Sequence, residues 1–391
     1  MIVAFFESWR CGQSATGWVS RYTCQRGTAS WLAIAFVAVL SGCASDRRIE
    51  EPARLSPTDA RTLISRSLPA NIADRSGWTT DIYAAFTALD IAPTPDHICA
   101  VAAITEQESS FRTDPAVPGL GKVAWKEIDR RAQDVGIPTI VVRTALRVSS
   151  PNGKSYAERI DAATTEKDLS EIFEDFIDMV PAGKTFFADR NPVRTGGPMQ
   201  VSIAFAEQQA QEKHYPYPVA GNIRSEVFTR RGGLYFGVAH LLDYTAPYDD
   251  MVYRFADYNA GHYASRNAAF QNAVNIVSSQ RLALDGDLLI EGSDQPSDTE
   301  LAIRTIRERL SLSDAEIRTA LERGDEPEFE RTSLYSRVLA LADAVPPGRP
   351  VPRAMVPRIQ LESPKITRNL TTDWFARRVD DRYMRCLASA H

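Results

Sequence analysis

Residues 98–108 read Ile-Cys-Ala-Val-Ala-Ala-Ile-Thr-Glu-Gln-Glu, an apolar run that ends in two carboxylates. Positions at helical spacing form one stripe that Glu108 continues, namely Ile98, Val101, Ile104 and Thr105. Glu106 points about 200° away around the helix. A carboxyl group on an apolar face is desolvated, which raises its pKa and makes it a proton donor at neutral pH. On this pattern alone, a carboxylate near the surface at a helix end is the alternative interpretation.

Far upstream of this helix, ten consecutive apolar residues from Trp31 to Leu40 precede Ser41-Gly42-Cys43. Ten helical residues reach about 15 Å, half the hydrocarbon thickness, so the segment does not span a bilayer. Arginines precede it, as in a signal peptide. Residues 40–43 resemble the bacterial lipobox, in which the cysteine is acylated and becomes the mature N-terminus. An ordinary signal peptide or a buried apolar helix is the alternative.

The composition adds two exclusions. The 391 residues are 44% hydrophobic and 24% charged, which is typical of a globular protein and not of a disordered chain. The net charge of −5 leaves no electrostatic footprint for nucleic acid. A lipid anchor at Cys43 implies the membrane as a partner, and Ala44 after it favours the periplasmic face of the outer membrane over the inner membrane.

Two cysteines remain once the leader is removed and Cys43 is lipidated. Cys11 and Cys24 lie in the leader, so only Cys99 and Cys386 are left in the oxidising periplasm. We expect these two to form a disulfide. Two buried thiols are the alternative.

The mature chain reads as mostly helical, with a small β-hairpin. Asp285-Gly286 stands between short apolar runs in residues 282–290, which is a hairpin signal. Capping residues and apolar periodicity predict helices from Pro57 and over 78–89, 95–111, 121–135, 165–179, 200–212, 224–230, 232–245, 264–280, 313–323 and 371–388.

Two further segments carry polar groups suited to a sugar ligand. Gly196-Gly197-Pro198-Met199-Gln200 is a glycine-rich entry into a helix, where backbone and side-chain amides can face a polar ligand. Residues 255–261 read Phe-Ala-Asp-Tyr-Asn-Ala-Gly and place a phenol beside an amide. They lie in an aromatic-rich stretch, and aromatic faces are surfaces on which pyranose rings stack, although core packing has the same composition.

Taken in chain order, these segments resemble the motifs of the lysozyme-like lytic transglycosylases. Glu108-Ser109 with Phe111 looks like the catalytic Glu-Ser segment, residues 197–200 look like the Gly-x-Met-Gln motif, and residues 258–261 match Tyr-Asn-Ala-Gly. The motifs cover roughly residues 78–280. More closely, the whole mature chain resembles an uncharacterised proteobacterial lipoprotein family grouped under a domain of unknown function.

The resemblance implies a mainly α fold: a lysozyme-like helical catalytic domain with a helical insertion, a small β-hairpin and a helical C-terminal extension. The expected organisation is a lipoprotein signal peptide (1–42), a lipid-anchored tether with a short helix (43–76), a transglycosylase domain (77–280, with the insertion about 118–194) and a mostly helical C-terminal region (281–391).

The implied activity is cleavage of peptidoglycan glycan strands between N-acetylmuramic acid and N-acetylglucosamine. Glu108 would be the only catalytic acid and base and would leave a 1,6-anhydro end. Ser109, Gln200 and Asn259 would bind substrate amides and hydroxyls, Tyr258 would hydrogen-bond and orient Glu108, and Met199 would pack under the sugar. A muramidase that uses water, or a non-catalytic peptidoglycan-binding lipoprotein with the same fold, is the alternative.

The sequence departs from the family pattern in three places. Glu108 and Met199 are 91 positions apart, where common members keep these segments close. Pro198 removes one backbone donor from its motif. Asp257 precedes Tyr258 where a small residue is usual, and it is interpreted either as a second cleft carboxylate or as a surface or capping group.

No cofactor or metal is expected. The five histidines show no metal-ligand spacing. His262 follows the last motif and is interpreted either as a residue at the cleft or as a structural one.

Overall fold

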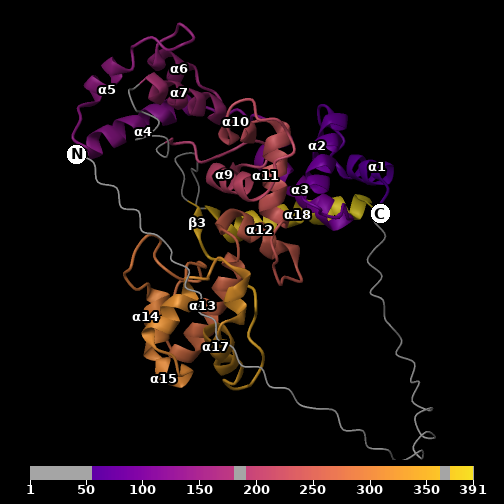
Figure 1. Cartoon of the computed structure of the whole chain (residues 1–391), viewed down its shortest axis with the longest axis vertical. Helices are drawn as coiled ribbons and strands as arrows, with labels where there is room; N and C mark the ends of the chain where they lie inside the picture. The colour runs from indigo at the N-terminus through magenta and orange to yellow at the C-terminus, as the bar shows by residue number, and fades with distance from the viewer. Residues whose placement is uncertain (1–54, 180–190, 362–369, 391) are drawn as a thin grey trace, which may run out of the picture. The chain divides into compact units, whose positions relative to one another are not determined.

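The computed structural model describes residues 55–179, 191–361 and 370–390 (Figure 1). Residues 54–391 group into one compact unit. The leader and Cys43 lie outside the described residues, so the predicted lipid attachment stays a prediction. Within the described ranges, no helix has both the length and the apolar character needed to cross a membrane.

The largest cluster of buried apolar side chains joins helices from both ends of the unit. Figure 1 shows α18 lying alongside α3 and α12, in agreement with its contacts to each of them. The elements of this cluster are α1 (Pro57–Ser67), α2 (Arg75–Ala88), α3 (Pro95–Ser109), β2 (Val201–Ser202), α9 (Ile203–Glu212), α10 (Ile223–Val227), α11 (Arg230–Leu242), α12 (Met251–Ala260) and α18 (Thr372–Ala390). Strand β1 (Thr195–Gly196) pairs with β2.

Helix α3 is defined at its start by a capping residue and clamped along its length by the C-terminal helix. The Thr94 side chain accepts from the backbone N–H of His97, and Pro95 takes the first helical position, where its missing N–H costs nothing. A disulfide joins Cys99 to Cys386 with a Cα–Cα distance of 5.5 Å. The C-terminal helix is therefore covalently attached to the helix that carries Glu108.

The segment between α3 and β1 has a small core of its own, formed around Tyr156 and Ile160. Its helices are α4 (Leu120–Asp134), α5 (Thr139–Ala145), α6 (Tyr156–Ala162) and α7 (Glu166–Met179). The prediction of a helical segment here is confirmed. The short helices α5 and α6 had no counterpart in the predicted ranges.

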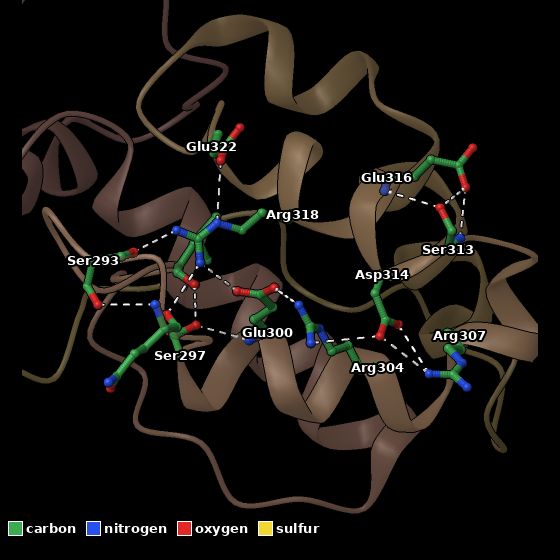
Figure 2. A network of polar contacts seen from close by, with 12 residues as sticks. Ser293, Ser297, Glu300, Arg304, Arg307, Ser313, Asp314, Glu316, Arg318 and Glu322 are labelled. Carbon is green, nitrogen blue, oxygen red and sulfur yellow. Dashed lines mark hydrogen bonds and ion pairs between the residues drawn. The ribbon is translucent and has the colours of Figure 1, made fainter.

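A third apolar cluster surrounds α13 (Ala264–Ser278). It contains α14 (Asp298–Thr305), α15 (Arg307–Leu310), α16 (Asp314–Leu321), the 3-10 helix η2 (Pro327–Arg331) and α17 (Ser333–Asp343). Figure 2 shows how α14 and α16 are tied together: the fully buried carboxylate of Glu300 pairs with Arg304 of its own helix and with Arg318 of α16, the latter at 2.9 Å.

The predicted hairpin at residues 282–290 is wrong in its position. Those residues form no strand, because side chains of α13 satisfy their backbone groups instead. The Gln271 amide donates to Asp285 at 2.7 Å and accepts from the N–H of Gly286 at 2.9 Å, while Asn275 accepts from the N–H of Leu282 at 2.7 Å. Short antiparallel pairs occur elsewhere, between β1 and β2 and between β3 (Gln360–Leu361) and β4 (Leu370–Thr371).

Candidate active site

Glu108 occupies the last turn of α3, immediately before the chain bends sharply. Ser110 and Phe111 both adopt positive φ angles, 52° and 57°, so the helix cannot continue past Ser109. The Glu108 side chain is partly exposed, yet burial of its carboxyl raises the pKa to about 7. This agrees with its predicted place on the apolar face. At neutral pH the carboxyl group is therefore about half protonated.

A cation on α18 moderates this shift. Arg382 lowers the pKa of Glu108 against the larger effect of burial. Its Nε atom also lies 3.5 Å from Glu106, and Arg385 lies 3.8 Å from the same carboxylate. Glu106 is thus paired with two arginines, whereas Glu108 faces one positive charge at longer range. Sequence reasoning missed Arg382, because only the packing of α18 on α3 brings it there.

The turn between β1 and β2 fits against a helix that presents glycines. Gly197 has φ 72°, and a Cβ atom there would lie 2.1 Å from the carbonyl oxygen of Val227. A Cβ atom on Gly233 would meet Pro198 at 2.4 Å, and one on Gly237 would meet the Met199 sulfur at 2.5 Å. Gly233 and Gly237 are four residues apart on α11, so they share the face on which the turn rests.

Tyr258 fastens this turn to α12. Its hydroxyl donates a hydrogen bond of 2.7 Å to the backbone oxygen of Met199. The expected hydrogen bond from Tyr258 to Glu108 is replaced by this one, since the phenol has a single proton to donate. Glu108 is still close enough to raise the pKa of Tyr258, after the larger effect of burial. The structure therefore brings Glu108, Tyr258 and the 196–200 turn together.

The Met199 side chain is fully buried against α11. The expected contact between this side chain and a sugar is therefore not available. Its backbone carbonyl instead accepts the hydrogen bond from Tyr258.

The three other predicted substrate-binding residues differ in their accessibility. Ser109 is buried and donates to the Thr105 carbonyl at 3.0 Å, so its hydroxyl is turned back onto α3. Gln200 is partly buried, and its Oε1 accepts from Thr195 at 3.2 Å. Asn259 is exposed, and its Oδ1 accepts from the Thr372 hydroxyl at 3.3 Å. The amide N–H groups of Asn259 have no hydrogen-bond acceptor among the described residues.

Asp257 is neither a cleft carboxylate nor a surface group. It is fully buried, and its oxygens accept from the backbone N–H of Tyr263 at 3.1 Å and of Ser265 at 2.7 Å, at the start of α13. The hydroxyls of Tyr244 and Tyr248 also donate to it. Burial raises the pKa of Asp257, and these hydrogen bonds oppose the rise. The capping interpretation is correct, in a buried setting.

His262 and the unpredicted His240 form a stacked pair behind Tyr258. Their ring centroids are 4.6 Å apart, and His240 lies 4.9 Å from the Tyr258 ring. His240 contacts the Tyr258 carbonyl at 3.1 Å, and His262 contacts the His240 carbonyl at 2.8 Å. Burial lowers the pKa of His240 to about 3, so its imidazole is neutral at pH 7. The hydrogen bond to the α12 backbone and the stacking on His262 are therefore made by a neutral ring. The pair supports α12, in line with a structural role for His262.

Among the described residues, no group of three histidine, cysteine, aspartate or glutamate side chains is arranged to hold a metal ion.

A family model described as "Protein of unknown function (DUF1615)" matches residues 71–389. The "Uncharacterized protein YaiW" of Escherichia coli (strain K12) is 54% identical over 358 residues, which cover 92% of this chain and 98% of that protein. Comparison with solved structures finds no match.

Proposed function

The chain belongs to the DUF1615 family, and on that premise we propose that it is a membrane-anchored peptidoglycan lytic transglycosylase with Glu108 as its general acid and base. The observation that carries the proposal is the carboxyl group of Glu108. The residue is half-buried, burial of its carboxyl group raises the pKa to about 7, and it lies beside the turn that Tyr258 secures. A general acid works best when its pKa is near the operating pH.

In this mechanism Glu108 performs both proton transfers. Its carboxyl proton passes to the glycosidic oxygen as the bond from that oxygen to C1 of N-acetylmuramic acid breaks. The resulting carboxylate then accepts the proton of the sugar's own 6-hydroxyl, whose oxygen bonds to C1. The products are a free 4-hydroxyl on N-acetylglucosamine and a 1,6-anhydro end, and Glu108 is protonated again.

The surroundings of Glu108 favour this route over ordinary hydrolysis. Glycoside hydrolases use two carboxylates that flank the scissile bond. Glu106 is paired with Arg382 and Arg385, and Asp257 is buried under hydrogen bonds from α13. Neither of these nearby acids is free to activate water or attack the sugar. Intramolecular attack by the 6-hydroxyl needs no second carboxylate.

The proposed setting is the periplasmic face of the outer membrane, with a lipid anchor at Cys43 and glycan strands as substrate. Stable anchoring requires more than one lipid chain, which lipobox processing supplies. The mainly helical unit that follows would then reach the cell wall from the membrane through the preceding tether.

The first test is release of soluble fragments from purified sacculi by the wild-type chain, Glu108→Gln and Glu207→Gln. Glu207 is an exposed carboxylate on α9 and serves as the matched control. The proposal requires release by the wild type and by Glu207→Gln, and its loss in Glu108→Gln with binding to sacculi retained. If the wild type binds sacculi without releasing fragments, the chain is a peptidoglycan-binding protein and the proposal fails.

A further inference from the structure

Large apolar side chains are exposed along the end of α4 and the whole of α5. Helix α5 buries none of its residues. Val135 is 69% exposed and Ile140 is 67% exposed. We define the 135–148 patch as the exposed aliphatic residues of this stretch: Val135, Ile137, Ile140, Val141 and Val148. Single apolar residues scattered over a surface are ordinary, whereas these five fall within fourteen consecutive positions.

The patch is embedded in positive charge, unlike the chain as a whole. Between residues 120 and 154 there are seven lysines and arginines and only three acids, whereas the full chain carries −5. The three acids are already paired, with Arg130, Arg131 and Arg143. The other cations make no ion pair with described residues, and all are exposed: Lys122, Lys126, Arg147 and Lys154. Their charge is available to an anionic partner.

An open groove of about 650 Å³ lies at this charge, lined by residues of α4, α5 and α6 and by none of the five patch residues. Four cations line it with two acids, Asp129 and Asp161: Lys122, Lys126 and Arg130 of α4 and Arg143 of α5. The Arg143 guanidinium stands over the Trp125 ring at 4.7 Å and pairs with Asp129 at 2.6 Å, which holds α5 beside the groove. Helix α5 therefore carries Arg143 of the groove as well as Ile140 and Val141 of the patch.

We propose that the 135–148 patch docks on a bilayer surface that contains anionic lipid. Aliphatic side chains would enter the boundary between headgroups and acyl chains, and the unpaired lysines and arginine would lie at the level of the phosphates. A protein partner is less well matched, because protein interfaces favour aromatic anchors and the patch holds only valine and isoleucine. This inference goes beyond the proposed function and does not depend on glycan cleavage.

The test is hydrogen exchange of residues 139–145 in the full chain, mixed with phosphatidylcholine vesicles with or without phosphatidylglycerol. We expect several-fold slower exchange with the anionic vesicles, reversed by high salt because screening shortens the reach of exposed charges. The readout is local, so it is valid whether or not Cys43 anchors the chain.

Variants assign the effect to its parts. Lys122→Gln with Lys126→Gln is expected to lower the docking equilibrium roughly 30-fold, since each cation near an anionic surface is worth about 1 kcal/mol. Ile140→Asp with Val141→Asp should abolish the slowing. Leu301→Asp, at an exposed leucine on α14, is the matched control and should leave it unchanged.

Two results would overturn the inference. The first is equal exchange of residues 139–145 on both kinds of vesicle. The second is protection that rises with protein concentration in the absence of lipid, which would show that a second copy of the chain occupies the patch.

Discussion

The Tyr258 hydroxyl donates its proton to the Met199 carbonyl at 2.7 Å, across 59 residues of sequence. Both groups are buried, so this bond is protected from water. It connects α12 to the turn between β1 and β2. This turn packs against Gly233 and Gly237, the glycine face of α11. The arrangement beside Glu108 thus depends on one phenol and two glycines.

Removing this phenol should loosen the turn. Tyr258→Phe leaves the Met199 carbonyl buried without its donor, which costs about 1–3 kcal/mol in the free energy of unfolding. We expect that loss in chemical denaturation, together with slower glycan cleavage. Tyr253→Phe is the control, since Tyr253 lies on the same helix and its hydroxyl has no hydrogen-bond partner among the described residues. Equal stability of the two variants would argue against the role given to Tyr258.

A Gly→Ala substitution on the glycine face of α11 should destabilise the protein, whereas the same change inside a helix usually stabilises it. Gly→Ala inside a helix normally stabilises by about 1 kcal/mol. Gly237→Ala places a Cβ atom 2.5 Å from the Met199 sulfur and should instead destabilise by about 1–3 kcal/mol. Gly221→Ala meets only Ser225 Oγ, at 3.1 Å, and should be nearly neutral. Thermal unfolding of the pair checks this; a stabilised Gly237→Ala would rule out the close packing.

Arg382 should set the alkaline limit of activity. Because this cation lowers the pKa of Glu108, Arg382→Met should raise that pKa and move the alkaline limb of kcat/KM to higher pH. Arg385→Met removes a cation that contacts Glu106 but does not act on Glu108, so its profile should keep the wild-type limb. Glycan cleavage by the two variants is measured from pH 5 to 9. Identical pH profiles would show that Arg382 does not influence the pKa of Glu108.

The protonation of Glu108 should also appear in stability. Its pKa rises on folding from 4.5 to about 7, so the folded state holds this proton more tightly than the unfolded state. The free energy of unfolding therefore falls as pH rises through this interval, by at most about 3 kcal/mol. Glu108→Gln should be more stable than the wild type at pH 8 and equally stable near pH 4. If the free energies of unfolding of both proteins changed with pH in parallel, the pKa of Glu108 would not be raised on folding.

The disulfide should contribute strongly, because it closes a loop of 287 residues. A double Cys99→Ser, Cys386→Ser variant is expected to lose about 3–5 kcal/mol in the free energy of unfolding. Labelling of the protein, isolated without reductant, with a thiol reagent offers an independent check. Modification of either cysteine before reduction would mean that the pair is not oxidised.

The sequence predicted the helices best where caps and periodicity coincide. Thr94 and Pro95 define the start of α3, and the capping box of Ser313 and Glu316 defines α16. No helix was predicted over α12, and the structure buries Asp257 of this helix against the start of α13. A carboxylate that caps another helix is a tertiary feature with no local signal.

Side-chain roles at the site were harder to predict than side-chain identity. Glu108 and Tyr258 do lie near each other, but the proton of Tyr258 goes to the Met199 backbone. Arg382 follows Glu108 by 274 positions in the chain and comes near it only through the packing of α18 on α3. The glycine face of α11 was visible in principle, since Gly233 and Gly237 are one turn apart.

Digestion of sacculi in heavy-oxygen water distinguishes intramolecular attack by the 6-hydroxyl, with Glu108 as acid and base, from attack by water. Mass analysis of the fragments should show 1,6-anhydro-N-acetylmuramic acid ends without heavy oxygen, absent with Glu108→Gln and present with Glu207→Gln. Reducing ends that carry heavy oxygen would show hydrolysis instead. Anhydro ends of equal yield from Glu108→Gln would contradict the assignment of the catalytic residue.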